Sequence, residues 1–424
     1  MHRPSVALLV CCVAPALAQA PGELFERLAS KDEAEAQAAH AALVAQGEAL
    51  VPELERRLEK KPPERIAARL RAVLSAIHSG GLDALLTPRF ELPDSAKLPA
   101  ALSPDGTRVL YAAREIDPAS LERSFEYRVA TVGDDGLKLE TVLRCAPGTR
   151  DDYLVPALRP GCWSPDGRLV GYTDGGAEGS RELIAGYVDV ESGKATTLGS
   201  APGVAHFAVR FDPRGERVAW IVVDPTTLSG AVQVRELKSG ATSTLALPEG
   251  GCPIDLSYLE DGRALVLVMR LPDANLQGNG RQRPQAQVCL VSADGKTHTA
   301  VEQAVTPDDY FWDGPPVLLR TPQGERAFLE ARDPSLGQKR PSLLWSFVPA
   351  KGEAKVLLSG CTWTPVGVID GRRLSVIAHD GSSAGVLDVG SGEVTPLPHT
   401  RVLLDRRGER AVLLDLETRR LWVN

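Results

Sequence analysis

Two different spacings of hydrophobic residues divide the chain. From about residue 21 to residue 80 the apolar residues recur three or four positions apart, as they do in amphipathic helices. The clearest examples are Leu50, Val51, Leu54, Leu58, Ile66, Leu70, Val73, Leu74 and Ile77. Gly47 ends one such helix, and Pro62 stands where the next begins. The sequence therefore predicts a small α-helical segment over residues 19–82.

Beyond residue 100 the apolar residues form short runs, and a turn phrase recurs between them. The runs Ser103 to Gly106 and Ser164 to Gly167 both read Ser-Pro-Asp-Gly. Five later turns keep part of this phrase, around Gly215, Gly262, Gly324, Gly371 and Gly408. Because Pro fixes φ, Asp hydrogen-bonds its own backbone and Gly accepts positive φ, each phrase predicts a tight hairpin.

An arginine follows each of these seven turns within two residues. These residues are Arg108, Arg168, Arg217, Arg263, Arg326, Arg372 and Arg410. They could form a basic binding ring or serve the fold. We favour the structural role, in which the stems cover the sheet and the charged groups lie in water or on the Asp of the turn.

A second pair of strands follows each hairpin, as in residues 183–190 and 195–198. Four antiparallel strands per repeat make a propeller blade. The sequence therefore predicts a mainly β protein, with a seven-bladed β-propeller of four-stranded blades over residues 100–424. Its last repeat offers only three strands, so we expect residues 83–99 to be a linker that also supplies the missing outer strand and closes the ring.

The Ser-Pro-Asp-Gly phrases in this setting resemble those of the TolB-like, WD-repeat-like family of bacterial β-propellers. The stretch from Asp32 to Ile77 resembles little more than one HEAT-type helical repeat. The TolB resemblance implies a platform for partners in the cell envelope, not a reaction. Since one or two helical hairpins do not bury a solenoid core alone, we expect the helical segment to pack on the following domain or on a partner.

Composition narrows the class of protein. The chain has 424 residues, 43% of them hydrophobic and 24% charged, which is enough for a buried core. Lys and Arg total 48 against 55 Asp and Glu, and no window concentrates the basic residues, so nucleic acid is not an expected partner. The 39 Gly and 32 Pro fit many short elements joined by tight turns.

The first 18 residues have the pattern of a secretory signal peptide. His2 and Arg3 precede an apolar stretch, and small residues at Ala16 and Ala18 suit a cleavage site that leaves Gln19 as the new terminus. No later apolar run is long enough to cross a bilayer. We therefore expect a periplasmic or secreted protein without a transmembrane segment, and the sequence does not separate these two locations or give the oligomeric state.

Five cysteines remain after the signal peptide: Cys145, Cys162, Cys252, Cys289 and Cys361. Their number is odd, so at least one thiol stays unpaired within the chain. Cys145 and Cys162 flank one loop and form a disulfide if the strands beside them are adjacent. Alternatively, all five are buried small apolar residues.

Two connections between predicted blades contain the same triplet, Asp-Asp-Tyr. In each, the second Asp lies fifteen residues before the glycine of the next turn, so the two triplets share a register. They lie on the predicted rim opposite the turns, where long connections gather and binding residues are expected. With the aromatic residue beside the second triplet, the candidate binding residues are Asp151, Asp152, Tyr153, Asp308, Asp309, Tyr310 and Trp312. Four carboxylates there suit a basic peptide or a divalent cation.

Duplication also explains the repeated triplet. The turn glycines recur at an offset of 156 or 157 residues, and a copied unit would carry the triplet whether or not it binds anything. The run Gly381 to Gly385 matches G-x-S-x-G, but it lies between two strands and not at a strand-to-helix elbow. The histidines are scattered without metal-ligand spacing.

We assign no catalytic residue and no cofactor on these grounds. The leading hypothesis is an exported, non-enzymatic propeller scaffold that binds a protein or peptide partner in the cell envelope. One alternative is an enzyme or binder that uses a small ligand or a cation at the acidic mouth of the channel. Another is that the helical segment, and not the propeller, binds the partner.

Overall fold

The computed structural model describes residues 20–95, 100–116, 123–146, 158–159, 161–175, 183–270, 285–300, 319–320, 327–332, 342–348, 353–378 and 380–424. The predicted signal peptide lies outside these ranges. The chain divides into two compact units, Met1–Ala84 and Leu85–Asn424, and each is described by itself. In the described part, no helix is both long enough and apolar enough to cross a membrane.

The first unit is helical. Its helices are α1 (Pro21–Leu28), α2 (Glu33–Ala45), a 3-10 turn (Gly47–Leu50), α3 (Val51–Glu59) and α4 (Glu64–Leu85). Asp32 caps α2, because its Oδ1 accepts a hydrogen bond from the amide of Ala34 at 2.9 Å. Arg69 caps the carboxyl end of α1, where its Nη1 donates hydrogen bonds to the carbonyls of Leu28 and Ser30.

The helices enclose an apolar cluster of their own. It consists of Leu24, Phe25, Leu28, Ala39, Leu43, Leu50, Leu54, Leu70, Val73, Leu74 and Ile77. The four helices therefore bury these side chains against one another. The expectation that this segment packs on the following domain or on a partner stays a prediction.

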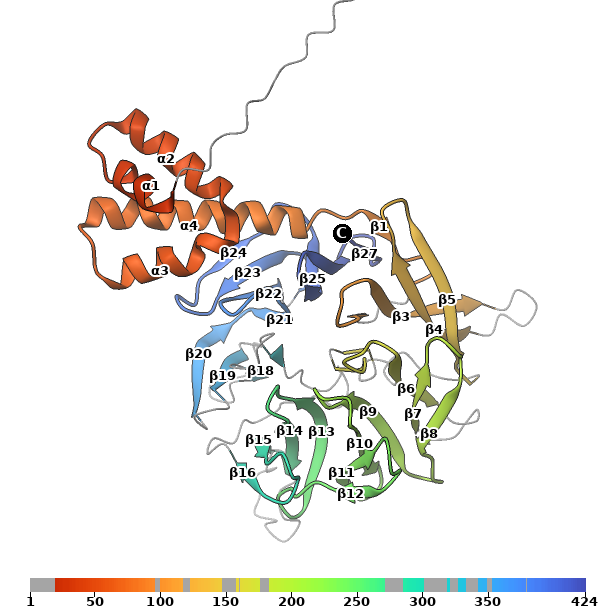
Figure 1. Cartoon of the computed structure of the whole chain (residues 1–424). Coiled ribbons are helices and arrows are strands. Elements are labelled where there is room, and N and C mark those ends of the chain that lie inside the picture. Colours follow the sequence, from red (N-terminus) through yellow and green to blue (C-terminus); the bar gives the residue numbers. More distant parts are fainter. Residues whose placement is uncertain are drawn as a thin grey trace, which may run out of the picture. The chain divides into compact units, whose positions relative to one another are not determined.

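The second unit consists of strands that follow one another in groups (Figure 1). The first sheet contains β2 (Ala101–Leu102), β3 (Arg108–Ile116), β4 (Arg123–Val132) and β5 (Leu137–Arg144). The next contains β6 (Leu169–Gly175), β7 (Leu183–Asp189), β8 (Ala195–Gly199), β9 (Ala205–Phe211), β10 (Arg217–Asp224), β11 (Ser229–Glu236) and β12 (Thr242–Thr244).

The remaining four sheets have four strands each. One contains β13 (Gly251–Tyr258), β14 (Ala264–Arg270), β15 (Gln285–Val291) and β16 (His298–Ala300). Another contains β17 (Leu319–Arg320), β18 (Ala327–Arg332), β19 (Ser342–Val348) and β20 (Glu353–Cys361). The third contains β21 (Trp363–Val368), β22 (Arg373–Ala378), β23 (Ala384–Asp388) and β24 (Val394–Pro396). The last contains β25 (Arg401–Arg407), β26 (Arg410–Asp415), β27 (Leu421–Val423) and β1 (Phe90–Glu91).

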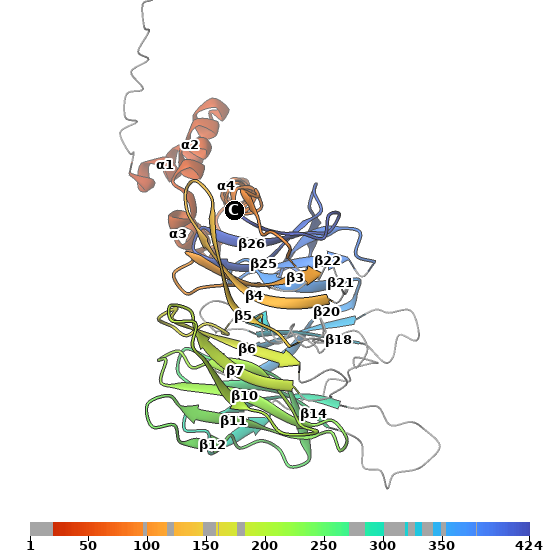
Figure 2. The ribbon, with the colours of Figure 1, turned by 90° about the vertical axis from the view of Figure 1, so that its right-hand side faces the viewer.

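The sheets succeed one another around a common centre, and the view at right angles shows many of their strands lengthwise (Figures 1 and 2). The prediction of a mainly β protein with a propeller arrangement after a few helices is confirmed. The predicted count of seven separate four-stranded blades differs from the six hydrogen-bonded sheets that the described residues form. The difference arises because β7 and β9 pair in parallel at one point, Leu183 with Ala205, which unites two consecutive groups of strands.

A short strap connects the last sheet with the first. β1 pairs antiparallel with β27, and Arg420 forms an ion pair with Glu91. Four residues later, Ser95 forms a bridge with Ala113 of β3. The chain just ahead of the first sheet therefore completes the last one, in the place where the sequence lacked an outer strand.

Five of the predicted hairpin turns have positive φ at their glycine, namely those at Gly106, Gly167, Gly215, Gly262 and Gly408. Gly371 does not have positive φ, and Gly324 lies outside the described residues. In the first turn, the amide of Gly106 donates to the carbonyl of Ser103 at 2.9 Å, and Asp105 Oδ1 accepts from the amide of Thr107 at 3.0 Å. Gly106 has φ +72°, a conformation that favours glycine. The Ser-Pro-Asp-Gly phrase thus specifies its turn by local chemistry alone.

Candidate functional site

The predicted binding residues Asp151, Asp152, Tyr153, Asp308, Asp309, Tyr310 and Trp312 all lie outside the described residues. The described strands show where their two segments start and finish. Residues 147–157 follow β5 and precede Leu158, and residues 301–318 connect β16 with β17. Both segments therefore run from the outer strand of one group to the inner side of the next. Since the Ser-Pro-Asp-Gly turns join first and second strands, these segments leave from the opposite ends of the strands.

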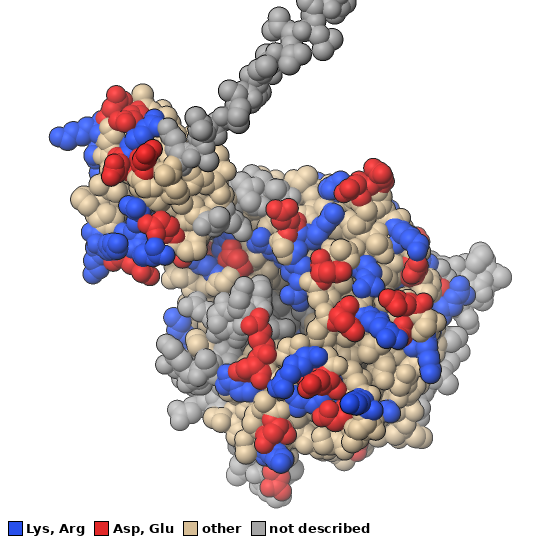
Figure 3. Space-filling model, viewed as in Figure 1, with Lys and Arg blue, Asp and Glu red and all other residues tan. Residues whose placement is uncertain are grey.

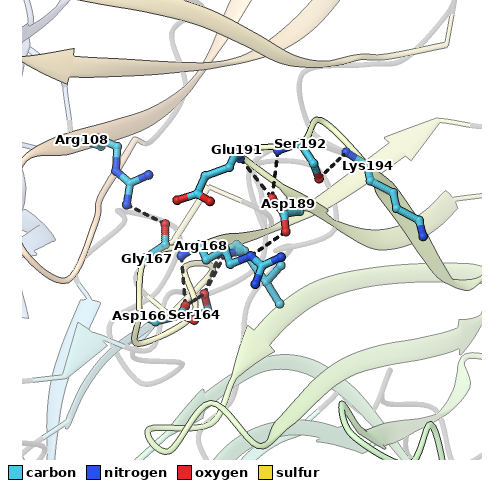
Figure 4. A network of polar contacts seen from close by, with 10 residues as sticks. Arg108, Ser164, Asp166, Gly167, Arg168, Asp189, Glu191, Ser192 and Lys194 are labelled. Atoms are coloured by element: carbon cyan, nitrogen blue, oxygen red, sulfur yellow. Dashed lines mark hydrogen bonds and ion pairs between the residues drawn. The ribbon is translucent and has the colours of Figure 1, made fainter.

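On the turn side, two arginines reach from one strand group to the next. Arg108 Nη2 donates to the carbonyl of Gly167 at 2.8 Å (Figure 4), and its guanidinium lies 5.3 Å from the ring centre of Trp163. Arg217 repeats the arrangement further along, since its Nη1 donates to the carbonyl of Ala293 at 2.7 Å. These hydrogen bonds join neighbouring turns, and each guanidinium group already has a partner in the next group of strands.

Other arginines after the turns pair with carboxylates. Arg168 Nε lies 2.7 Å from Asp189 Oδ2 (Figure 4), and Arg372 makes the equivalent pair with Asp388 at 2.8 Å. Arg263 pairs with the Asp of its own turn at 2.7 Å. In the described turns these arginines serve the fold, as predicted, but only Arg217 and Arg263 pair with the Asp of their own turn. The others bind a carbonyl or another carboxylate, and Arg326 lies outside the described residues. Figure 3 shows positive and negative side chains interspersed over the visible face of this unit.

Hydrogen bonds stabilise the ionised form of the carboxylates on these turns. The hydroxyl of Ser164 donates to Asp166 Oδ1 at 2.5 Å and lowers the pKa of that carboxyl. The amide of Ser192 donates to Asp189 Oδ1 at 3.0 Å and lowers the pKa of Asp189. These carboxylates stay ionised and hydrogen-bonded well below neutral pH. Many charged groups on the turn side therefore already have partners within the protein.

Three buried charged residues meet beside the inner strands. Arg159 Nη1 donates to Asp255 Oδ2 at 2.9 Å, and Arg210 Nη2 lies 3.8 Å from Asp255 Oδ1. All three side chains are less than one-tenth exposed. Arg210 is on β9 and Asp255 on β13, whereas Arg159 follows directly after the segment that contains the first triplet. The Arg159–Asp255 ion pair therefore anchors the end of that segment at β13.

Irregular pairing accompanies these charges. β13 shifts register between Pro253 and Asp255, and β25 does so between Leu403 and Asp405. Such bulges redirect side chains and are common beside functional sites. Asp405 uses its Oδ2 to accept a hydrogen bond from the amide of Leu102 on β2 at 2.9 Å, which links the last sheet with the first.

Sequence analysis did not single out the buried charges. The available signal was a lone charged residue inside an otherwise apolar inner strand. Arg210 is the lone charged residue of this kind in the strand Ala205–Phe211, and Asp255 is the one in the strand Gly251–Tyr258. Burial of a charge is costly without a partner, so such residues indicate ion pairs across strands, but not which residues form them.

The described cysteines do not provide reactive thiols. Cys145, Cys162, Cys252 and Cys289 are free and buried, so Cys145 and Cys162 do not form the disulfide that the sequence left open. Burial raises the pKa of the Cys252 thiol to about 11 and that of Cys162 to about 12. Thiols of this kind are almost fully protonated at neutral pH and behave as small apolar residues. The side chain of Cys361 lies outside the described set.

Two further candidates from the sequence are a metal site and the G-x-S-x-G run. Among the described residues, no group of three or more His, Cys, Asp and Glu side chains is placed to hold a metal ion. The G-x-S-x-G run lies between β22 and β23, where the hydroxyl of Ser382 donates to Asp380 Oδ1 at 2.6 Å. Its position between two strands agrees with the expectation from sequence.

Comparison with known proteins places the fold but not a family. No known family profile matches the chain, and no curated protein matches it. The β-propeller domain of the Trilobed protease from Pyrococcus furiosus is 12% identical, with a TM-score of 0.52 over 80% of this chain and 94% of that one. This similarity supports the propeller arrangement of the second unit and, at such low identity, nothing about its activity.

Other solved structures are less similar. An oligogalacturonate lyase in complex with manganese is 10% identical, with a TM-score of 0.47 over 79% of this chain and 89% of that one. TolB from Acinetobacter baumannii is 14% identical, with a TM-score of 0.37 over 75% of this chain and 79% of that one. These two similarities say nothing about the function of this chain, because a shared fold does not imply a shared function.

Proposed function

We propose that this chain is a non-enzymatic propeller scaffold that binds a protein or peptide partner through the rim opposite the Ser-Pro-Asp-Gly turns. The observation that carries the proposal is where the described strands before and after the two Asp-Asp-Tyr segments end and begin. Each segment connects the outer strand of one group with the inner side of the next, so both leave the strands on the same side of the ring. Acidic and aromatic side chains repeated on one rim suit a basic peptide surface.

The opposite rim supports this choice. Its arginines donate to carbonyls of neighbouring turns or pair with carboxylates, as in Arg108 with Gly167 and Arg168 with Asp189. Charged groups that already have partners offer little to a ligand, because a ligand has to replace those contacts. The rim that bears the triplets is therefore the better candidate for recognition.

The chemistry of the described part favours binding over catalysis. Its four cysteines are buried free thiols, and burial raises the pKa of Cys145, Cys162 and Cys252. Its G-x-S-x-G run lies in the turn between β22 and β23 and the first residues of β23. Export through the segment 1–18, action in the cell envelope and membership of the TolB-like family belong to the same proposal. So does a ring of seven blades, in which β6–β8 and β9–β12 count separately despite the Leu183–Ala205 pair.

The test is affinity capture from an envelope extract with the chain that starts at Gln19. A variant with Asn at positions 151, 152, 308 and 309 is compared with a matched control on the turn side. The control changes four exposed acids there, Asp134→Asn, Asp135→Asn, Glu191→Gln and Glu260→Gln. We expect the wild type and the control to retain one partner that the first variant loses. Equal capture by all three proteins would contradict the assignment of the rim.

The second candidate function is binding of a divalent cation or a small ligand at the same rim. It is favoured by the same four carboxylates, because hard cations prefer oxygen ligands. Elemental analysis of the purified chain separates the two: one bound metal ion per chain, lost in the four-Asn variant, would support this candidate. A metal-free protein that still captures its partner would dismiss the cation.

A further inference from the structure

His206 lies where two groups of strands join. It follows Ala205 on β9, whose pairing with Leu183 of β7 is the one parallel contact that unites these groups. The imidazole ring lies directly against Gly199, the last residue of β8, because a Cβ on that glycine would be 2.1 Å from His206 Nδ1. The ring thus fits between β8 and β9 only because residue 199 has no side chain.

A single hydrogen bond determines which nitrogen of this ring carries the proton. Trp220 of β10 donates from its Nε1 to His206 Nδ1 at 3.3 Å, so Nδ1 is an acceptor. In the neutral ring the proton is therefore on Nε2, which is buried without a hydrogen-bond partner. Protonation would place a second N–H on the ring, directly facing the N–H of Trp220, and the hydrogen bond would be lost.

The strands packed against the ring supply little compensation for a positive charge. β8 carries no charged residue between Ala195 and Gly199. On β10 the charged residues are Arg217 at the far end and Asp224, two residues beyond Val222, which pairs with His206. Asp224 already accepts hydrogen bonds from the amides of Thr226 and Thr227.

β7 and β9 do not supply a free negative charge beside the ring either. β7 has Tyr187, and its Asp189 pairs with Arg168 at the far end of the strand. β9 itself adds Arg210, a second positive charge. Burial accordingly lowers the pKa of His206 from its ordinary value of 6.5.

We propose that the His206–Trp220 hydrogen bond is a pH-sensitive latch between these two strand groups, and that its loss on protonation of His206 loosens the Leu183–Ala205 contact. β7 begins at Leu183 and β9 at Ala205, so the change occurs at strand ends opposite the turns. The latch is independent of the proposed function, because it concerns how the ring is held and not what it binds. Mild acidification protonates His206, and the two neighbouring strand ends then separate.

The sign of the effect follows from the lowered pKa. The unfolded or opened chain takes up a proton near the ordinary value, whereas the closed junction resists it. The latch therefore contributes its full stability above pH 6.5 and loses it as the pH falls below that value. Each unit by which burial depresses the pKa corresponds to about a tenfold weakening of the closed junction.

Nuclear magnetic resonance of the chain with labelled His and Trp side chains tests the latch. We expect His206 to titrate below 6.5 and the Trp220 indole N–H resonance to move with the same midpoint. Over the same range the hydrogen-exchange protection of the Ala205 amide should fall, by about tenfold per unit of pKa depression. Titration of His206 at or above its ordinary value would overturn the proposal, as would a Trp220 resonance that does not follow it.

Two variants separate the latch from a general acid effect. His206→Gln keeps an oxygen acceptor that does not titrate in this range, so the pH dependence of the Trp220 resonance should disappear. The matched control is His298→Gln, at an exposed position on β16, which should leave that dependence unchanged. If His206→Gln does not fold, Trp220→Phe removes the donor, and the pKa of His206 should then rise towards 6.5. An unchanged pKa would contradict the role of the hydrogen bond.

Discussion

Ala208 has an unusual backbone for its residue type. Its φ is +55°, although it is fully buried in the inner strand β9, where it and Val209 form the irregularity in pairing between Phe207 and Arg210. A left-handed conformation costs an L-residue with a Cβ about 1–2 kcal/mol, and glycine does not pay this cost. The strained residue therefore helps to shape the strand that presents Arg210 to Asp255.

We predict that Ala208→Gly does not lower the free energy of unfolding and raises it by up to about 1 kcal/mol. The matched control is Ala219→Gly on β10, which is equally buried and pairs with Arg210 in the extended strand. There glycine should cost about 1 kcal/mol, because it loosens the unfolded chain more than the folded one. Urea unfolding of both variants checks this. Equal destabilisation by the two would refute the strain at Ala208.

The buried thiols give a second test on single residues. In a Cys361→Ser background without the segment 1–18, Cys145, Cys162, Cys252 and Cys289 should not react with a thiol reagent at pH 8 in the folded protein. Burial raises the pKa of Cys252 to about 11 and that of Cys162 to about 12, so their reactive thiolate forms are scarce at this pH. Counting free thiols before and after addition of denaturant measures this, and all four should react once the chain unfolds. Rapid reaction of any thiol in the folded state would contradict the packing.

Between elements, buried polar contacts hold neighbouring strand groups in place. The hydroxyl of Tyr127, on β4, donates to the carbonyl of Thr173 at 2.6 Å and accepts from its amide at 3.1 Å. Thr173 is fully buried on β6, in the next group of strands. One phenol hydroxyl thus satisfies both backbone groups of a residue in another sheet.

Tyr127→Phe should therefore destabilise the protein by about 2 kcal/mol or more, because it leaves a buried amide and a buried carbonyl without partners. Tyr187→Phe on β7 is the matched control and should change stability by less than about 0.5 kcal/mol. Thermal or urea unfolding of the two variants gives the comparison. A loss in Tyr127→Phe no larger than in the control would show that the hydroxyl does not bridge the sheets.

The buried ion pair between Arg159 and Asp255 also holds neighbouring strand groups in place. Arg159→Gln leaves Asp255 buried with one guanidinium fewer, and breaking a buried pair costs about 3–5 kcal/mol. Arg263→Gln breaks an ion pair with Asp261 that is partly exposed and should cost less than about 1 kcal/mol. Denaturant unfolding compares the two. Similar small losses would mean that the buried pair does not anchor the segment ahead of Arg159.

Elements differed in how far the sequence could predict them. The turns were predictable because Ser, Pro, Asp and Gly act on their own backbone, as Asp105 and Gly106 show. The joining of β7 to β9 was not, because it depends on one parallel pair, Leu183 with Ala205, between residues that are separated along the chain. Buried partners such as Arg159 and Asp255, 96 positions apart, were also beyond reach, since spacing along the chain gives no distance across the ring.

At the scale of the whole chain, repetition was the informative signal. Recurrence of one hairpin phrase predicted a ring of sheets, and the similarity to a solved propeller domain at a TM-score of 0.52 supports it. The strap from Phe90 to Ser95 joins the last sheet with the first. For the candidate site, the sequence predicted residues that lie outside the described part, so the structure supports only the side of the ring from which their segments leave.

The proposed binding rim is tested most directly by site-specific photo-crosslinking in the envelope. A photoreactive amino acid replaces Tyr153, Tyr310 or, as the control on the turn side, the exposed Asp135. We predict that one and the same partner is crosslinked from positions 153 and 310 and not from position 135. Crosslinking from position 135 alone, or no protein partner from positions 153 and 310, would contradict the claim that this rim of the propeller binds a protein.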